Sequence, residues 1–120
     1  MSGVLINIDV PNINAGLAFY TQAFGLRVGR RFGDAFVELL GLPAPIYLLE
    51  NSAGTSTSPS GGDIRRYDRH WSPIHLDIVV DDLAAAVARV TAAGAVQEGE
   101  TRTAPYGELA LFADPFGHGF

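Results

Sequence analysis

The chain has 120 residues, enough for one hydrophobic core but too few for two independent domains. Hydrophobic residues make up 48 % of the chain and charged residues 18 %, a balance that excludes an intrinsically disordered protein. Eight basic side chains stand against thirteen acidic ones, and the resulting net charge of −5 repels phosphate backbones and anionic membranes. We therefore expect neither nucleic acid nor a membrane as a partner.

The absence of cysteine excludes disulfides, thiolate metal sites and a cysteine nucleophile. It also fits a reducing compartment, and residues 1–9 lack the basic and apolar pattern of an export signal, so we expect a cytoplasmic protein. The mean hydropathy is slightly positive, which favours a homodimer in which a second copy covers part of the apolar surface.

The first fifty residues predict a strand, a helix and three further strands. Residues 5–12 read LINIDVPN, in which every second residue is apolar, as in a half-buried strand. A helix is expected to begin at Asn12, whose side chain can cap free backbone N–H groups, and to end at Gly25. Turn residues then separate three extended runs, which we place at residues 26–32, 35–40 and 46–50.

Residues 51–73 form the longest segment without a helix or strand pattern. The first part of this segment is rich in Ser, Thr, Gly and Pro, and we expect it to be disordered. The part from Tyr67 to Trp71 carries bulky side chains that could bury area over a ligand, so it is interpreted as a lid.

The plan of the first half recurs 70 residues later. Residues 75–82 read HLDIVVDD and align with residues 5–12. A second helix is expected between Asp82 and Gly94. The extended runs that follow are placed at residues 95–103, at 108–113 and from His118 onward, the last being cut short at Phe120.

The sequence thus predicts an α+β fold in which two βαβββ repeats form a concave mixed sheet. We expect a single domain over residues 1–120. Its halves are residues 1–50 and 74–120, and the loop 51–73 joins them.

Several short motifs occur in the same order as in a known superfamily. They are Phe19-Tyr20, Phe24-Gly25-Leu26, the HLDIVVDD run and the ending DPFGHGF at residues 114–120. Together with the repeat, they make the chain resemble the vicinal oxygen chelate superfamily, which includes glyoxalases, ring-cleaving dioxygenases and bleomycin-resistance proteins. The resemblance spans nearly the whole chain and implies the fold, whereas the function has to be decided by the site.

For metal-dependent members of the superfamily, the resemblance implies ligands from the first, fourth, fifth and eighth strands. The matching positions are Leu5, Glu50, His75 and a position just beyond Phe120. Leu5 has no lone pair for a metal, so His75 and Glu50 remain as tentative metal ligands or catalytic residues, one fewer than a catalytic divalent site normally uses. We therefore expect no resident cofactor, with a divalent metal as the open alternative.

Strand alternation places His75 on the concave side independently of the resemblance, because odd-numbered residues of both repeated strands share that side. The structural alternatives are a histidine satisfied by Asp77 or Glu50, and an ordinary strand-end carboxylate for Glu50. His70 and His118 are interpreted as structural imidazoles in loops. Core packing, a dimer interface or an exposed strand face would equally explain the candidates for substrate binding, which are Asn7, Asp9, Phe36, Tyr47, Trp71, Asp77 and Phe112.

Two classes of function remain from the sequence. The first is a metal-independent module that binds a small cationic or planar molecule, as the resemblance to antibiotic-resistance proteins implies. The second is a metal-dependent glyoxalase-like lyase or isomerase, or a dioxygenase, in which the metal would chelate vicinal oxygens and Glu50 would move a proton. Leu5 at the first ligand position favours binding.

Overall fold

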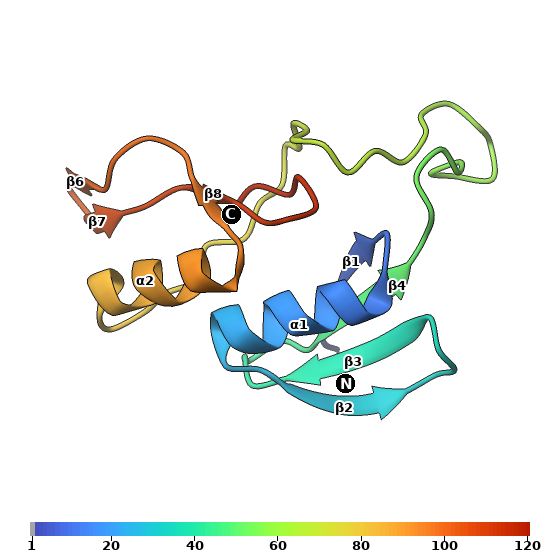
Figure 1. Ribbon diagram of the computed structural model, residues 1–120, viewed down its shortest axis with the longest axis horizontal. Coiled ribbons are helices and arrows are strands. Elements are labelled where there is room, and N and C mark those ends of the chain that lie inside the picture. Colours follow the sequence, from blue (N-terminus) through green and yellow to red (C-terminus); the bar gives the residue numbers. More distant parts are fainter. Residues whose placement is uncertain (1) are drawn as a thin grey trace.

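The computed structural model describes residues 2–120 and places the helices of the two halves next to each other (Figure 1). The first half has the expected order of one strand, one helix and three strands: β1 (Ile6–Val10), α1 (Ile13–Phe24), β2 (Arg27–Arg31), β3 (Phe36–Leu40) and β4 (Ile46–Glu50). Its sheet has the order β1-β4-β3-β2, in which β1 runs parallel to β4 and the other neighbours are antiparallel.

The second half is less regular than the first. It contains α2 (Leu83–Ala93), β5 (Val96–Gln97), β6 (Arg102–Ala104), β7 (Gly107–Leu109) and β8 (Phe112–Ala113). β5 pairs with β8, and β6 pairs with β7, in two separate sheets. The expected runs at 95–103 and 108–113 are each divided into two short strands, so the second half does not follow the βαβββ plan strand for strand.

The expected strand at residues 75–82 is absent, and this is the largest difference from the sequence prediction. In the first half, β1 obtains its backbone partners from β4. The counterpart of β4, His118–Phe120, hydrogen-bonds to β8 through Phe112 and Phe120, and within residues 2–120 no strand pairs with the segment after His75. The predicted alternation persists without pairing, because up to residue 80 the even-numbered residues are half-buried and the odd-numbered ones exposed.

Both helices begin and end where the sequence predicts. The side chains of Asn12 and Asp82 accept hydrogen bonds from the backbone N–H groups of Ala15 and Ala85, at 2.9 and 3.0 Å. Gly25 ends α1 in a left-handed conformation with φ of 63°, which glycine adopts without steric penalty. The capping residues that the sequence provides therefore fix the boundaries of both helices.

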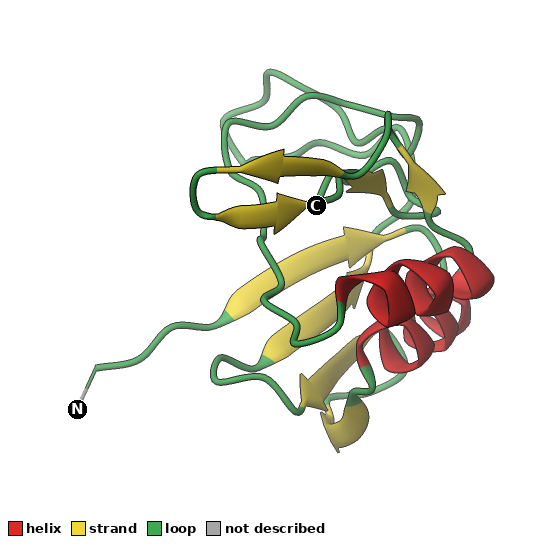
Figure 2. Ribbon diagram, turned by 90° about the vertical axis from the view of Figure 1, so that its left-hand side faces the viewer, coloured by secondary structure: helices red, strands yellow, loops and turns green. Residues whose placement is uncertain are grey.

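The core lies between the first sheet and the two helices, which pack side by side on one side of the molecule (Figure 2). Arg89 of α2 donates its Nε–H to the carbonyl of Ala23 on α1 at 2.9 Å. The largest fully buried side chains are Val10, Phe19, Val37, Leu39, Ile46 and Leu48. Neither helix in residues 2–120 has the length and apolarity needed to cross a bilayer.

The segment after β4, which we expected to be disordered, is folded in the structure. Ser56 and Ile64 form a β-bridge, and Arg65 exchanges backbone hydrogen bonds with Gly54 and Thr55 at 2.8 and 2.9 Å. The guanidinium of Arg65 also forms an ion pair with Asp9 of β1 at 2.8 Å. The polar residues of this loop thus satisfy one another's backbone groups, an ordering that composition alone does not predict.

Candidate functional site

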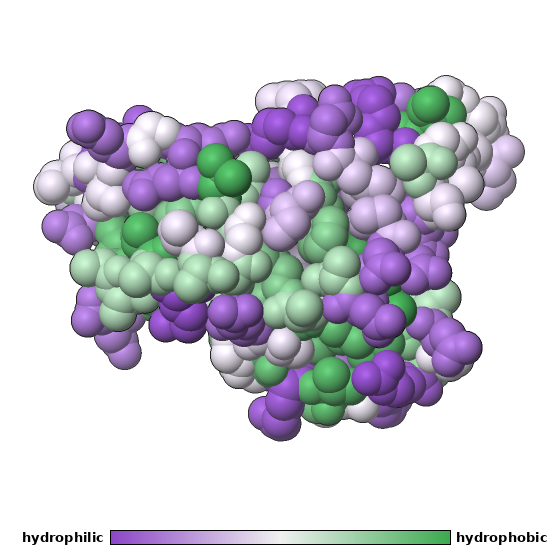
Figure 3. All heavy atoms as spheres, in the orientation of Figure 1, coloured by the Kyte–Doolittle hydropathy of each residue, from purple (hydrophilic) through white to green (hydrophobic). Residues whose placement is uncertain are grey.

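A cavity of about 820 Å³ lies where β1, the segment after the lid and the C-terminal residues meet. Both faces of β1 reach it, as do residues 69–78 and β8 with the residues that follow it. In Figure 3 hydrophilic side chains gather along the top of the molecule, over the loop 51–70, and apolar side chains lie below them. A cavity of this size and mixed lining suits a small organic ligand.

The structure places five of the predicted site residues in the cavity wall: Asn7, Asp9, Trp71, Asp77 and Phe112, together with the candidate catalytic residue His75. His75 Nε2 lies 3.4 Å from the carboxylate of Asp77, and both side chains are exposed. The carboxylate of Asp9 accepts hydrogen bonds from Arg65 at 2.8 Å and from Asn51 at 3.0 Å. Trp71 is 84 % exposed although it lines the cavity, so a ligand could bury it further.

Glu50 does not join His75 in the structure. Its Oε2 accepts a hydrogen bond from the backbone N–H of Ile13 at 2.8 Å, and the residue does not line the cavity. The end of β4 lies beside the first turn of α1, where free N–H groups and the helix dipole attract a carboxylate. Across residues 2–120 no three His, Asp or Glu side chains gather as metal ligands. The residues at the implied ligand positions, Leu5, Glu50 and His75, therefore do not fit a metal site in this chain.

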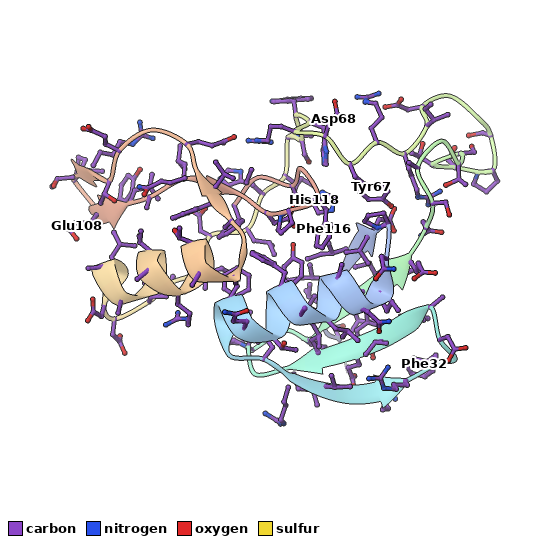
Figure 4. The ribbon with its side chains drawn as sticks, viewed as in Figure 1. Phe32, Tyr67, Asp68, Glu108, Phe116 and His118 are labelled. Atoms are coloured by element: carbon purple, nitrogen blue, oxygen red, sulfur yellow. The ribbon has the colours of Figure 1, made fainter. Side chains whose placement is uncertain are left out.

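Phe36 and Tyr47, also predicted to contact substrate, lie in a separate aromatic cluster with Phe32. The ring of Phe36 lies 5.1 Å from that of Phe32 and 5.3 Å from that of Tyr47. Neither Phe36 nor Tyr47 lines the cavity, and Figure 4 shows Phe32 at the tip of the β2–β3 hairpin, away from His118. These two predicted binding residues are thus not brought to the cavity.

A buried carboxylate lies beside this aromatic cluster. Glu38 is 6 % exposed and accepts hydrogen bonds from Arg30 and from the hydroxyl of Tyr47, at 3.1 and 2.8 Å. The Arg30 side chain, the Arg30 backbone N–H and the Tyr47 hydroxyl lower the pKa of Glu38 to about 2. Because the carboxylate is held ionised by structural partners, this cluster fits a stabilising role rather than proton transfer.

The expected lid is docked on the C-terminal turn. The backbone N–H of His70 donates to the carbonyl of Gly117 at 3.2 Å, and the hydroxyl of Tyr67 donates to the carbonyl of Asn51 at 2.5 Å. Figure 4 shows Asp68 above the turn that carries Phe116 and His118, and Tyr67 beside that turn. The lid therefore forms one wall of the cavity.

The contact between His70 and His118 was not predicted from the sequence. Nε2 of His70 lies 3.0 Å from Nδ1 of His118, and both residues line the cavity. Forty-eight residues separate the two histidines, and no spacing rule links a loop histidine to one in a distant turn. The DPFGH turn in the sequence is the signal that fixes the position of His118, but nothing in it identifies the partner.

A family model described as a glyoxalase-like domain matches residues 5–120. The chain belongs to this glyoxalase-like domain family. This family match confirms the vicinal oxygen chelate superfamily, with its glyoxalases, that the sequence motifs predicted. No curated protein matches the chain significantly.

Solved structures confirm the glyoxalase-like fold at low sequence identity. A variant of the fosfomycin resistance protein FosX from Listeria monocytogenes, solved with Mn(II) and a dihydroxypropylphosphonic acid, has a TM-score of 0.71 and 20 % identity over 100 % of this chain and 87 % of its own. TioX from Micromonospora sp. ML1 has a TM-score of 0.69 and 20 % identity, covering 99 % of this chain and 94 % of its own. Lactoylglutathione lyase from Agrobacterium tumefaciens has a TM-score of 0.65 and 18 % identity, over 98 % of this chain and 89 % of its own.

Proposed function

We propose that this glyoxalase-like domain binds a small molecule in the cavity without a metal at the positions of Leu5, Glu50 and His75. The proposal rests on the different places of two of these residues. His75 lines the cavity, whereas the carboxylate of Glu50 accepts a backbone N–H at the start of α1. A single imidazole would hold a first-row metal ion weakly, so ligand recognition is assigned to the lining itself.

The lining favours a planar ligand, and a cationic one in particular. Trp71 and Tyr106 present exposed aromatic surface at the cavity, on which a flat or cationic group can stack. Asp77 supplies a carboxylate in the same wall, and the whole chain carries a net charge of −5. Apolar side chains such as Ile78 complete a surface able to desolvate a ring.

The alternative is a metal-dependent lyase, isomerase or dioxygenase. It is supported by the fold shared with FosX, which was solved with Mn(II), and with a protein named lactoylglutathione lyase. In this alternative His75 would be one ligand, and Glu50 would have to leave the N-terminus of α1.

The proposal is tested by titrating the protein with a cationic planar dye such as proflavine and, separately, with an anionic aromatic probe, 8-anilinonaphthalene-1-sulfonate. Calorimetry should show saturable binding of the cationic dye in the presence of EDTA, and the fluorescence of Trp71, the sole tryptophan, should change in parallel. Asp77→Asn and Trp71→Phe should weaken dye binding several-fold, whereas Asp34→Asn, in the exposed β2–β3 turn, should not.

Two results would contradict the proposal. One is dye binding that Asp77→Asn and Trp71→Phe leave unchanged. The other is stoichiometric Zn, Ni, Fe or Mn that is lost in both His75→Ala and Glu50→Ala, together with lyase or dioxygenase turnover, which would establish the enzyme alternative.

We further propose that the protein is a homodimer. The segment from Ile74 to Val80 has the alternation of a strand but no strand partner within residues 2–120. Ile74 and Val79 are 80 % and 94 % exposed, respectively. An unpaired apolar edge of this kind is readily covered by a second copy.

A further inference from the structure

Hydrogen bonds at the outer nitrogens of His70 and His118 determine which nitrogens are protonated. Nδ1 of His70 lies 3.0 Å from the carbonyl of Asp68, and Nε2 of His118 lies 2.7 Å from the carbonyl of Asp9. A carbonyl only accepts, so each of these ring nitrogens carries the hydrogen. When both rings are neutral, Nε2 of His70 and Nδ1 of His118 carry no hydrogen. Each presents a lone pair to the other across 3.0 Å.

Two lone pairs at this distance repel each other unless a cation lies between them. The rings are not aligned end to end, since their centres are 4.9 Å apart and their planes cross at 77°. A straight N–H···N hydrogen bond, the preferred geometry for a shared proton, would put the ring centres roughly 5.3 Å apart. The two rings are therefore bent away from a straight N–H···N arrangement, and a metal ion bound by both nitrogens would also relieve the repulsion between the lone pairs.

We propose that His70 and His118 form a binding site for a divalent transition-metal ion that prefers imidazole ligands, in particular Cu²⁺ or Ni²⁺. A metal bonded to both nitrogens at about 2.0–2.1 Å would subtend an angle of roughly 94°, which is close to the right angle between neighbouring ligands in tetragonal coordination. Cu²⁺ and Ni²⁺ accept neighbouring imidazole ligands in tetragonal coordination, and Cu²⁺ binds nitrogen sites most tightly among the first-row divalent ions.

The surroundings of His70 and His118 have features that are typical of metal sites in proteins. Each imidazole donates its second N–H to a backbone carbonyl, the arrangement that orients histidine ligands in metalloproteins. Both rings are half-buried in the cavity wall, so the remaining coordination positions are open to water or to a ligand in the cavity. The guanidinium of neighbouring Arg69 pairs with Glu98 at 2.7 Å, which offsets its positive charge near the metal.

This site is distinct from the positions that the metal-dependent superfamily members imply, because it includes neither His75 nor Glu50. The proposed binding of a planar cation requires no metal at His70 and His118. Either proposal can therefore fail while the other holds.

The test uses the full chain without a polyhistidine tag, dialysed against EDTA and then against metal-free buffer. Calorimetric titration with Cu²⁺ and with Ni²⁺ should show one equivalent of bound metal. His70→Ala and His118→Gln should each weaken this binding at least tenfold, whereas the matched control His75→Ala should not. Electron paramagnetic resonance of the one-to-one Cu²⁺ complex should show a tetragonal signal with splitting from two imidazole nitrogens.

Circular dichroism of each variant establishes that it is folded, and His70→Ala, in the loop, provides a second route if His118→Gln unfolds the turn. The proposal is overturned if tight metal binding is absent, if it survives both substitutions, or if it is lost in His75→Ala. It is also overturned if nitrogen NMR shows a proton shared by the two rings that an equivalent of Cu²⁺ or Ni²⁺ does not displace.

Discussion

Tyr20 of α1 donates its hydroxyl to the carboxylate of Asp114, which follows β8, and this buried hydrogen bond joins the two halves of the chain. The other oxygen of Asp114 accepts the backbone N–H groups of Phe116 and His118 at 2.8 and 2.9 Å. Burial, and then the negative charge of Asp114 and the hydrogen bond to it, raise the pKa of Tyr20 well above its usual range. One carboxylate thus both shapes the C-terminal turn and fastens it to α1.

Removing this hydroxyl should destabilise the protein. Tyr20→Phe leaves one oxygen of a buried carboxylate without its donor, and we expect the free energy of unfolding to fall by about 1–3 kcal/mol. Tyr106→Phe is the matched control, since Tyr106 is 78 % exposed and should change stability by less than about 0.5 kcal/mol. Urea unfolding followed by circular dichroism measures both variants, and equal stabilities would contradict the prediction.

The ionised Glu38 should make stability depend on pH in the acid range. Its pKa in the folded protein, about 2, lies below the value near 4.5 expected when unfolded. Its contribution is therefore fully present above pH 4.5 and is lost as the pH falls towards 2. Wild type should exceed Glu38→Gln in stability at pH 7, and the difference should shrink below pH 4.5. Urea unfolding at a series of pH values tests this, with Glu100→Gln, at an exposed position, as control.

A side chain at residue 117 should displace the lid. Gly117 has φ of 84°, and a Cβ there would overlap the backbone carbonyl of Asp68. Gly33, with φ of 78° and no atom within 4 Å of its Cβ position, is a control with the same backbone strain but no contact. We expect Gly33→Ala to cost about 1–2 kcal/mol and Gly117→Ala clearly more.

Hydrogen exchange separates displacement of the lid from a general loss of stability. The amide of His70, which donates to Gly117, should exchange faster in Gly117→Ala than global unfolding explains, and Gly33→Ala should show no such local effect. Unchanged local protection of this amide in Gly117→Ala would show that the lid does not depend on the close approach.

The proposed dimer should depend on the unpaired segment that follows the lid. Val79→Lys places a charge at a position that is 94 % exposed in the single chain, and burial of that charge would oppose association. Size-exclusion chromatography with light scattering should show a dimer for wild type at micromolar concentration and a shift towards monomer for Val79→Lys. Ala84→Lys, on the exposed face of α2, should remain dimeric. A monomeric wild type would refute the proposal.

The sequence by itself determined the local structure of the first half and the limits of both helices. Asn12 and Asp82 cap the helices by contacts within three residues, and period-2 alternation marks β1 and the buried side of the segment after His75. The motifs that the chain shares with its family also predicted the superfamily, because the order of the motifs along the chain follows the fold. Such signals are readable because each depends on neighbours along the chain.

Tertiary structure decided which of the candidate residues meet. Glu50 was predicted to join His75, but its carboxylate instead accepts the backbone N–H of Ile13 at the start of α1. The paired imidazoles of His70 and His118 come together only because the lid folds onto the C-terminal turn. Contacts between residues so distant in sequence depend on how the elements pack against one another. Local sequence patterns do not predict that packing.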